Sequence, residues 1–195
     1  MCSNVRKLMQ IGALLTLAVL LSLPASAATN SNNATVALTA TVNTSLTVGL
    51  SSATQTWNTA NSNALTPGAA SNNGNAGITV TTTWVLQPGH TSVALYGYFA
   101  SAAAALVPTA GTTNIPSSAF EIKVGAGSFT AVSGTNAGFG VAGSSLLLQT
   151  TAITAANKVS NATAALTFNI NLTSLPQLPA DTYTGTLNIQ AQATP

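Results

Sequence analysis

Charged side chains are almost absent from this sequence. Its 195 residues include four Lys or Arg, two Asp or Glu, one His and one Cys. After residue 27 the acidic and basic side chains that remain are Glu121, Lys123, Lys158, Asp181 and His90. Acid/base catalysis, metal binding and thiol chemistry each need several such groups close together. The sequence therefore predicts a protein that is not an enzyme, with no catalytic residue, no cofactor and no metal site.

The N-terminal segment 1–27 has the pattern of a cleavable signal peptide. Arg6 and Lys7 form a short basic region, an apolar run follows from Ile11 to Leu23, and Ala25-Ser26-Ala27 matches a signal-peptidase site. A run of about 13 apolar residues is short for a membrane span, which needs roughly 20. We therefore expect secretion, no membrane span after cleavage, and one mature domain over residues 28–195.

Removal of this segment changes the charge balance. Arg6 and Lys7 are half of the basic residues, so the mature chain carries two positive and two negative side chains. A neutral surface has no electrostatic attraction for nucleic acid, and we expect no nucleic-acid partner. The single cysteine, Cys2, also lies in the signal segment, so disulfides do not contribute to the stability of the mature domain.

Alternation of apolar with hydroxyl or amide residues, the period of a β-strand with one buried face, recurs along the rest of the chain. It runs first from Thr35 to Leu50. Further runs cover 78–86, 93–99, 120–124, 166–172 and 187–193, separated by turn-forming sequences rich in Pro, Gly and Asn. Many short strands without intervening helices are typical of an all-β protein, and we expect a single immunoglobulin-like antiparallel β-sandwich.

The C-terminal segment 174–191 carries a family resemblance. Pro179-Ala180-Asp181-Thr182-Tyr183, followed by Leu187 and Ile189, resembles the ending of spore coat protein U-like and chaperone-usher fimbrial subunits. In that ending a Pro-Ala turn and a tyrosine introduce the last strand. The resemblance implies a secreted bacterial subunit of a coat or fibre, in which one copy lends an extended strand to a neighbour's sheet.

The residues themselves offer a candidate for such a strand near the start of the mature chain. Val36, Leu38, Ala40 and Val42 share one face of an extended segment, and strand addition to an exposed sheet edge is a recurrent mode of recognition. The alternative is an ordinary first strand within its own sheet. The sequence is compatible with both a donated strand and an ordinary first strand.

Tyr96 and Tyr98 form a second candidate site. They alternate with Leu95 and Phe99, so we expect them on the face of the sheet opposite the core. An exposed pair of tyrosines can stack on a sugar or form a contact between subunits. The alternative is packing against a neighbouring strand.

The remaining polar residues predict little chemistry. His90 lies in a turn, Gln87-Pro88-Gly89-His90, with no second ligand nearby, and we interpret it as a surface residue. Glu121 and Lys123 are two residues apart on one strand, which indicates a solvated ion pair.

The main functional hypothesis is a secreted, non-catalytic structural or adhesive surface protein, located in the periplasm, on the cell surface or outside the cell. Its partners would be copies of itself or related subunits, joined in a coat or fibre by strand addition. The alternative is a carbohydrate-binding module that binds glycans through its surface tyrosines.

Overall fold

The computed structural model describes residues 34–58, 60 and 62–195. The predicted signal peptide, residues 1–27, lies outside this range. The chain divides into a first unit that ends at Thr41 and a compact second unit, Val42–Pro195. All the strands reported below belong to the second unit.

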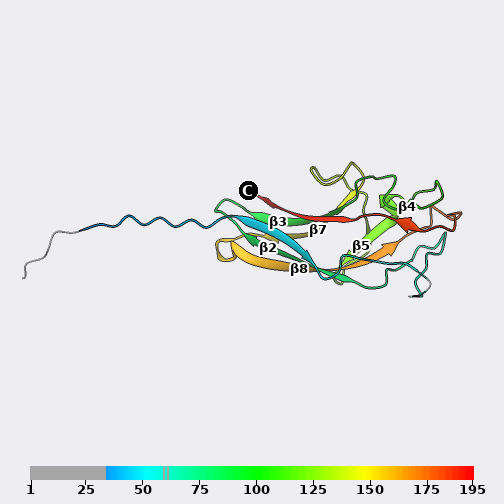
Figure 1. Cartoon of the computed structure of the whole chain (residues 1–195), viewed down its shortest axis with the longest axis horizontal. Coiled ribbons are helices and arrows are strands. Elements are labelled where there is room, and N and C mark those ends of the chain that lie inside the picture. Colours follow the sequence, from blue (N-terminus) through cyan, green and yellow to red (C-terminus); the bar gives the residue numbers. More distant parts are fainter. Residues whose placement is uncertain (1–33, 59, 61) are drawn as a thin grey trace, which may run out of the picture. The chain divides into compact units, whose positions relative to one another are not determined.

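The second unit is built from antiparallel β-strands, as the sequence predicts (Figure 1). The strands are β1 (Ser45–Leu50), β2 (Ile78–Val85), β3 (Ser92–Tyr98), β4 (Val107–Pro108), β5 (Phe120–Val124), β6 (Thr130–Ala131), β7 (Ser145–Ala152), β8 (Val159–Ile170), β9 (Tyr183–Thr184) and β10 (Asn188–Thr194). Five strands form one sheet in the order β1-β2-β8-β5-β6, three form a second in the order β10-β3-β7, and β4 pairs with β9. Short 3₁₀ turns occur at Ser117–Ala119 and Ala155–Asn157. Within the described residues no helix is long and apolar enough to cross a membrane.

Side-chain alternation explains how each strand is buried. In β2, Ile78, Val80 and Trp84 are buried, whereas Thr79 and Thr83 between them are exposed. The branched threonines suit extended backbone, and their hydroxyls stay in contact with water. One face of the strand therefore packs inward and the other meets solvent.

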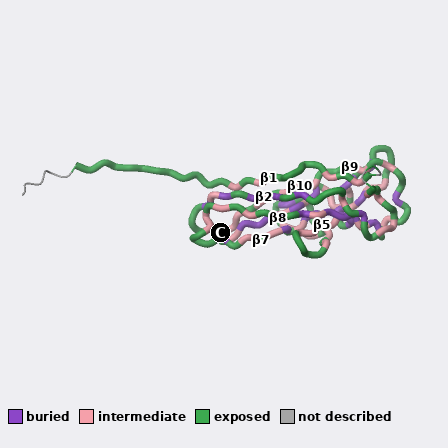
Figure 2. Tube along the Cα trace, turned by 90° about the horizontal axis from the view of Figure 1, so that it is seen from below, coloured by how far each residue is buried: buried purple, intermediate pink, exposed green. Residues whose placement is uncertain are grey.

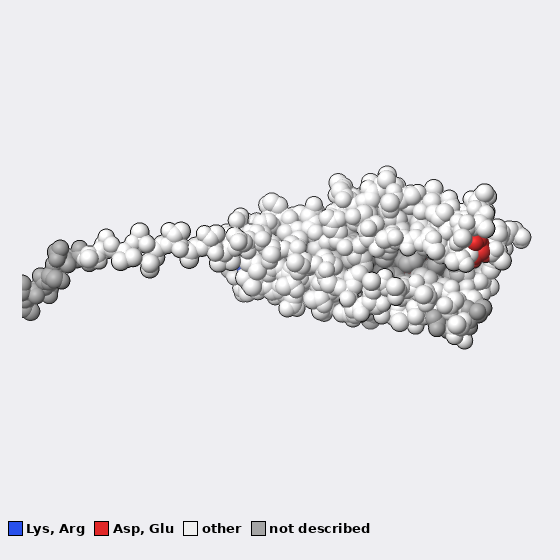
Figure 3. All heavy atoms as spheres, in the orientation of Figure 1, with Lys and Arg blue, Asp and Glu red and all other residues white. Residues whose placement is uncertain are grey.

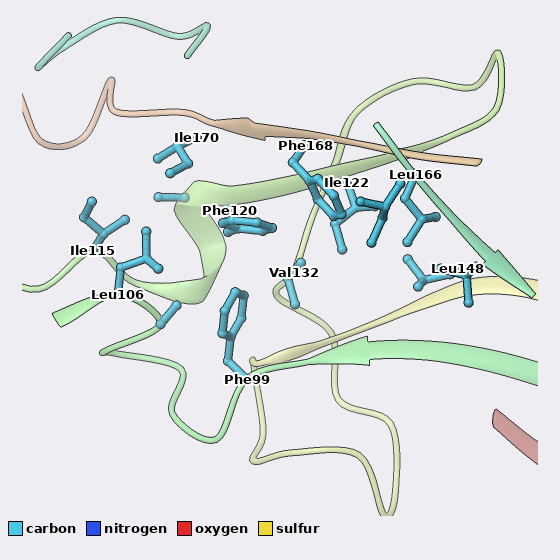
Figure 4. Close-up of a cluster of buried hydrophobic side chains, with 14 of the residues drawn as sticks. Phe99, Leu106, Ile115, Phe120, Ile122, Val132, Leu148, Leu166, Phe168 and Ile170 are labelled. Carbon is cyan, nitrogen blue, oxygen red and sulfur yellow. The ribbon is translucent and has the colours of Figure 1, made fainter. Parts of the chain in front are cut away.

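Both large sheets contribute to one hydrophobic core. Phe120 and Phe168 come from the five-stranded sheet, and Leu95 and Leu148 come from the three-stranded sheet. Figure 2 marks the buried positions along the strands, and Figure 4 shows side chains of the cluster. A smaller cluster of Trp84, Leu86, Val93 and Ile153 lies near the β2–β3 turn. Burial of these apolar side chains, rather than disulfides, holds the sheets together.

Two parts of the strand pattern differ from the prediction. The alternation that begins at Thr35 forms a strand only from Ser45 onward. The strand β7 was not expected, because its three consecutive leucines, Leu146–Leu148, do not alternate with polar residues. Its pairing to β3 skips Leu148, since Tyr96 faces Leu147 whereas Leu95 faces Gln149. This bulge lets an irregular sequence pair in the sheet.

Strand pairing gives the second unit two distinct ends. The turn after Val85 leads into β3, so Val85 and Ser92 lie at one end, which we call the turn end. Ser45 pairs with Val85 and Thr194 pairs with Ser92, so β1 begins and β10 finishes at the turn end. The opposite end carries Leu50, where β1 finishes, and Asn188, where β10 begins.

Candidate assembly groove

An open groove of about 1000 Å³ lies at the end of the second unit opposite the turn end. Its walls are residues 52–58, which form no regular strand, and residues 178–187, which include the short strand β9. Its floor is made of core side chains, namely Ile78, Phe99, Leu106, Phe120, Phe168 and Ile170. The space-filling view shows the molecule hollowed on this face (Figure 3). An apolar floor that reaches the core is suited to apolar side chains from a binding partner.

The aromatic floor of the groove is rigidly packed. Phe99 and Phe120 meet edge to face with ring centroids 5.2 Å apart, and Figure 4 shows the two rings directed toward each other. Phe120 also contacts Phe168 with a centroid separation of 5.8 Å. Such aromatic pairs have preferred geometries, so the floor presents a fixed shape.

Two sheet edges flank the groove. The strands β1 and β10 are each the last strand of their sheet, with a strand neighbour on one side only within the described residues. Leu187 and Ile189, at the start of β10, line the groove and pack against the core. The edge of β10 therefore offers main-chain hydrogen-bonding groups beside an apolar surface, the combination that strand addition requires.

A tryptophan fixes the wall formed by residues 52–58. Trp57 donates its indole N–H to the main-chain oxygen of Asn72 at 2.8 Å. Its ring meets Phe120 edge to face at a centroid distance of 5.9 Å. The wall is thus attached both to the floor and to the turn that contains Asn72.

The opposite wall carries Asp181, the groove's charged residue. Its carboxylate accepts main-chain N–H groups from Thr109, Ala110, Gly111 and Thr182 at 2.6–3.2 Å. The Gly111 bond is the main cause of a pKa below the usual value, and the other three bonds act in the same direction. The carboxylate therefore ties the loop after β4 to the segment that leads into β9.

Tyr183 belongs to the same wall. Its hydroxyl donates to the main-chain oxygen of Pro179 at 2.8 Å. Burial, and then the negative charge of Asp181, raise the pKa of this phenol above its ordinary value. Tyr183 therefore stays protonated and keeps the Pro-Ala turn closed.

The candidate donor residues lie outside both sheets. Residues 34–44, which we call the N-terminal extension, form no strand. Val36, Leu38 and Val42 are 80, 90 and 77 % exposed, and Ala40 is exposed as well. Exposure of several large apolar side chains in a regular pattern is unusual unless another surface covers them.

The second candidate pair, Tyr96 and Tyr98, lies away from the groove on the outer face of the three-stranded sheet. Phe139 packs on both rings, stacked on Tyr96 with centroids 3.9 Å apart and edge-on to Tyr98 at 5.9 Å. Tyr98 also donates its hydroxyl to Gln190 at 3.0 Å. Phe139 thus occupies a ring face of Tyr96 on which a sugar would stack, and both tyrosines are only half-exposed.

The other polar residues have structural partners. The expected ion pair is wrong: Glu121 accepts hydrogen bonds from Asn169 and Asn171, and Lys123 lies over the ring of Phe129. The ammonium group of Lys158 donates a hydrogen bond to the main-chain oxygen of His90 at 2.6 Å. Within the described residues no cluster of His, Cys, Asp or Glu could hold a metal ion.

The groove itself was not predicted from the sequence, because its walls have no periodic pattern. The Pro179–Tyr183 turn, noted above for its family resemblance, forms part of one wall. Comparisons of the chain with models of protein families, with curated proteins and with solved structures found no match.

Proposed function

We propose that this protein is a secreted, non-catalytic structural subunit with an immunoglobulin-like β-sandwich, and that copies of it join head to tail by strand addition. The N-terminal extension of one copy enters the groove of the next. Val36, Leu38, Ala40 and Val42 face the apolar floor, and the main chain pairs with the open edge of β10.

The observation that carries the proposal is the match between an exposed apolar segment and an open apolar groove. Val36, Leu38 and Val42 are each at least 77 % exposed, and the groove floor consists of core side chains. The segment from Val36 to Val42 has seven residues, the same number as β10. Both therefore span about 20 Å when extended, so the segment is long enough to enter the groove and reach the edge of β10.

The ends of the second unit give the direction of the added strand. The chain enters this unit at the turn end, where β1 begins, whereas the groove lies at the other end. A second copy therefore inserts its extension from the groove side of the first copy. Residue 44 of the inserted extension then lies nearest the groove opening, and residue 34 points toward the turn end of the first copy. The added strand then runs antiparallel to β10, which starts at the groove end. Antiparallel pairing has the more favourable hydrogen-bond geometry.

The electrically neutral surface supports the same proposal. Within the described residues the charged side chains are Glu121, Lys123, Lys158 and Asp181, and the face in Figure 3 is almost uniformly uncharged. Copies of such a molecule do not repel one another, and few lysines guard the sheet edges against pairing. The resemblance of residues 174–191 to coat and fimbrial subunits adds the expectation of a periplasmic or extracellular location.

A matched pair of substitutions in the extension tests the proposal. Leu38→Asp places a charge on the face that enters the groove, and Thr39→Asp places the same charge on the adjacent, opposite face. We expect the purified Thr39→Asp protein to form oligomers like the unmodified chain, and Leu38→Asp to remain monomeric in size-exclusion chromatography and negative-stain microscopy. A monodisperse monomer from the unmodified chain at high concentration would overturn the proposal.

Complementation between two defective variants tests the head-to-tail arrangement. Leu50 lines the groove and is 45 % exposed, so Leu50→Asp damages the groove with little effect on the core. The Leu50→Asp copy keeps an intact extension, and the Leu38→Asp copy keeps an intact groove. We expect each alone to be monomeric and their mixture to give a dimer with one copy of each. Complexes larger than a dimer, or no association between the two variants, would contradict this arrangement.

A further inference from the structure

The wall of the groove depends on a chain of buried amide groups that begins outside the groove. Trp57 is attached to the main-chain oxygen of Asn72, and that oxygen also accepts the N–H of Ile170 at 3.0 Å. The side chain of Asn72 accepts the N–H of Thr66 at 2.7 Å and donates to Ile170 O at 2.9 Å. Asn72 thus holds two parts of the loop 52–75 against the end of β8.

A second buried asparagine holds Asn72 in turn. Asn169 accepts the main-chain N–H of Asn72 on its Oδ1 at 2.7 Å. Its Nδ2 donates to Ala70 O at 3.1 Å and to Glu121 Oε2 at 2.7 Å. Asn72 and Asn169 are 5 and 3 % exposed, so water does not replace these bonds. Buried polar groups without a partner are costly, which makes the orientation of each amide important.

Glu121 and the main-chain oxygen of Ala70 together fix which way the Asn169 amide points. An ionised carboxylate only accepts hydrogen bonds, so the Asn169 NH₂ group must face Glu121 and its oxygen must face the N–H of Asn72. Glu121 lies opposite Asn169 in the β5–β8 ladder and does not line the groove. A glutamine at position 121 can keep this orientation through its own oxygen, but its bond to Asn169 Nδ2 is then no longer charge-assisted and is weaker.

We propose that Glu121 is a positioning residue for strand addition: through Asn169 and Asn72 it sets the place of Trp57 and so the width of the groove for an entering strand from a second copy. This inference rests on the proposed function of the groove. A residue on the outer face of the five-stranded sheet, outside the groove, thus affects how the groove binds the entering strand.

Binding of a peptide to the full chain tests the inference. The receptor is the Leu38→Asp protein, whose groove stays empty in the proposed mechanism, and the probe is a fluorescent peptide with the sequence of residues 34–44. We expect Glu121→Gln in this receptor to weaken peptide binding on the order of tenfold, since one charge-assisted bond in the chain becomes a weaker, neutral one. The control is Lys123→Gln, on the same face of β5 but outside the amide chain, which leaves the affinity within about twofold.

The outcomes separate the two proposals. If the Leu38→Asp receptor does not bind the peptide, the proposed function of the groove is wrong. If it binds and Glu121→Gln binds equally well, the groove function stands and the positioning role of Glu121 is wrong.

Hydrogen exchange distinguishes positioning from a general loss of stability. In Glu121→Gln we expect faster exchange at the indole N–H of Trp57 and at the amides of Thr66 and Asn72. The amides of the β3–β7 ladder should keep their protection, because this ladder shares no bond with the amide chain. An equal loss of protection in both regions would overturn the inference.

Discussion

Asp181 accepts the main-chain N–H of Gly111 on its Oδ2 at a distance of 2.7 Å. The two residues are 70 positions apart, so one carboxylate joins two loops that the chain order keeps separate. Three further main-chain donors converge on the same group. This concentration of donors around a single anion makes the groove's outer wall sensitive to protonation.

The pKa of Asp181 is lowered from 3.8 in the folded state, so its ionised form stabilises the fold. This contribution is complete above the unfolded pKa and is lost as the pH falls through the lower, folded pKa. We expect the free energy of unfolding to decrease with acidification below about pH 4. Denaturant titrations at several pH values would show a weaker decrease in Asp181→Asn. Identical pH profiles for the two proteins would contradict this role.

Alanine substitutions at two glycines in the loop before β7 distinguish the cost of backbone strain from the cost of a steric clash. Gly138 and Gly140 both have positive φ, 86° and 72°. A Cβ at Gly138 meets nothing within 4 Å, but at Gly140 it would lie 2.6 Å from the main-chain oxygen of Phe99. We expect Gly138→Ala to cost about 1 kcal/mol and Gly140→Ala about 3 kcal/mol. Chemical denaturation measures both, and equal costs would contradict the close approach.

The two sheets meet closely at Ile122 and Gly97. A Cβ on Gly97 would lie 3.4 Å from the Cδ1 atom of Ile122, which is 1 % exposed. We expect Ile122→Val, which removes that methyl group, to cost about 1 kcal/mol. The cost should be smaller by about 0.5 kcal/mol in a Gly97→Ala background, where the new methyl group fills part of the space. A double-mutant cycle with strictly additive effects would show that the two positions do not share this space.

Assembly should depend on apolar burial and not on charge. The extension contains no charged residue, and Asp181 is the charged residue of the groove. We expect the concentration for half-maximal oligomer formation to change by less than about twofold over a tenfold range of NaCl. Sodium sulfate should favour assembly, since it strengthens apolar burial. Light scattering measures both, and dissociation by NaCl would indicate an electrostatic interface.

The sequence predicts those parts of the fold in which a local pattern determines burial. In β2 the alternation of Val80 and Trp84 with threonines was sufficient to assign a buried face. In β7 three leucines in a row conceal the strand, because its bulge depends on pairing with β3. The N-terminal extension shows the opposite case: its alternation continues into β1, yet residues 34–44 form no strand.

The candidate site was harder to predict because distant residues build it. The groove walls are mostly irregular, and their positions depend on bonds such as Asn72 to Asn169, 97 residues apart. The asparagine-rich turn at 72–75 was visible in the sequence only as a turn. Glu121 was expected to pair with its strand neighbour Lys123, since sequence distance does not show that Asn169 of β8 and Asn171 just after it reach the Glu121 carboxylate.

Phe139 also has a consequence for how this surface could change during evolution. Its ring covers Tyr96 and touches Tyr98, beside the amide of Gln190. Replacement of Phe139 by a small residue would uncover two aromatic rings next to a hydrogen-bonding side chain, the combination of groups that binds sugars. Replacement of Phe139 alone would therefore convert a packed sheet face into an exposed aromatic surface, on which glycan recognition could be selected.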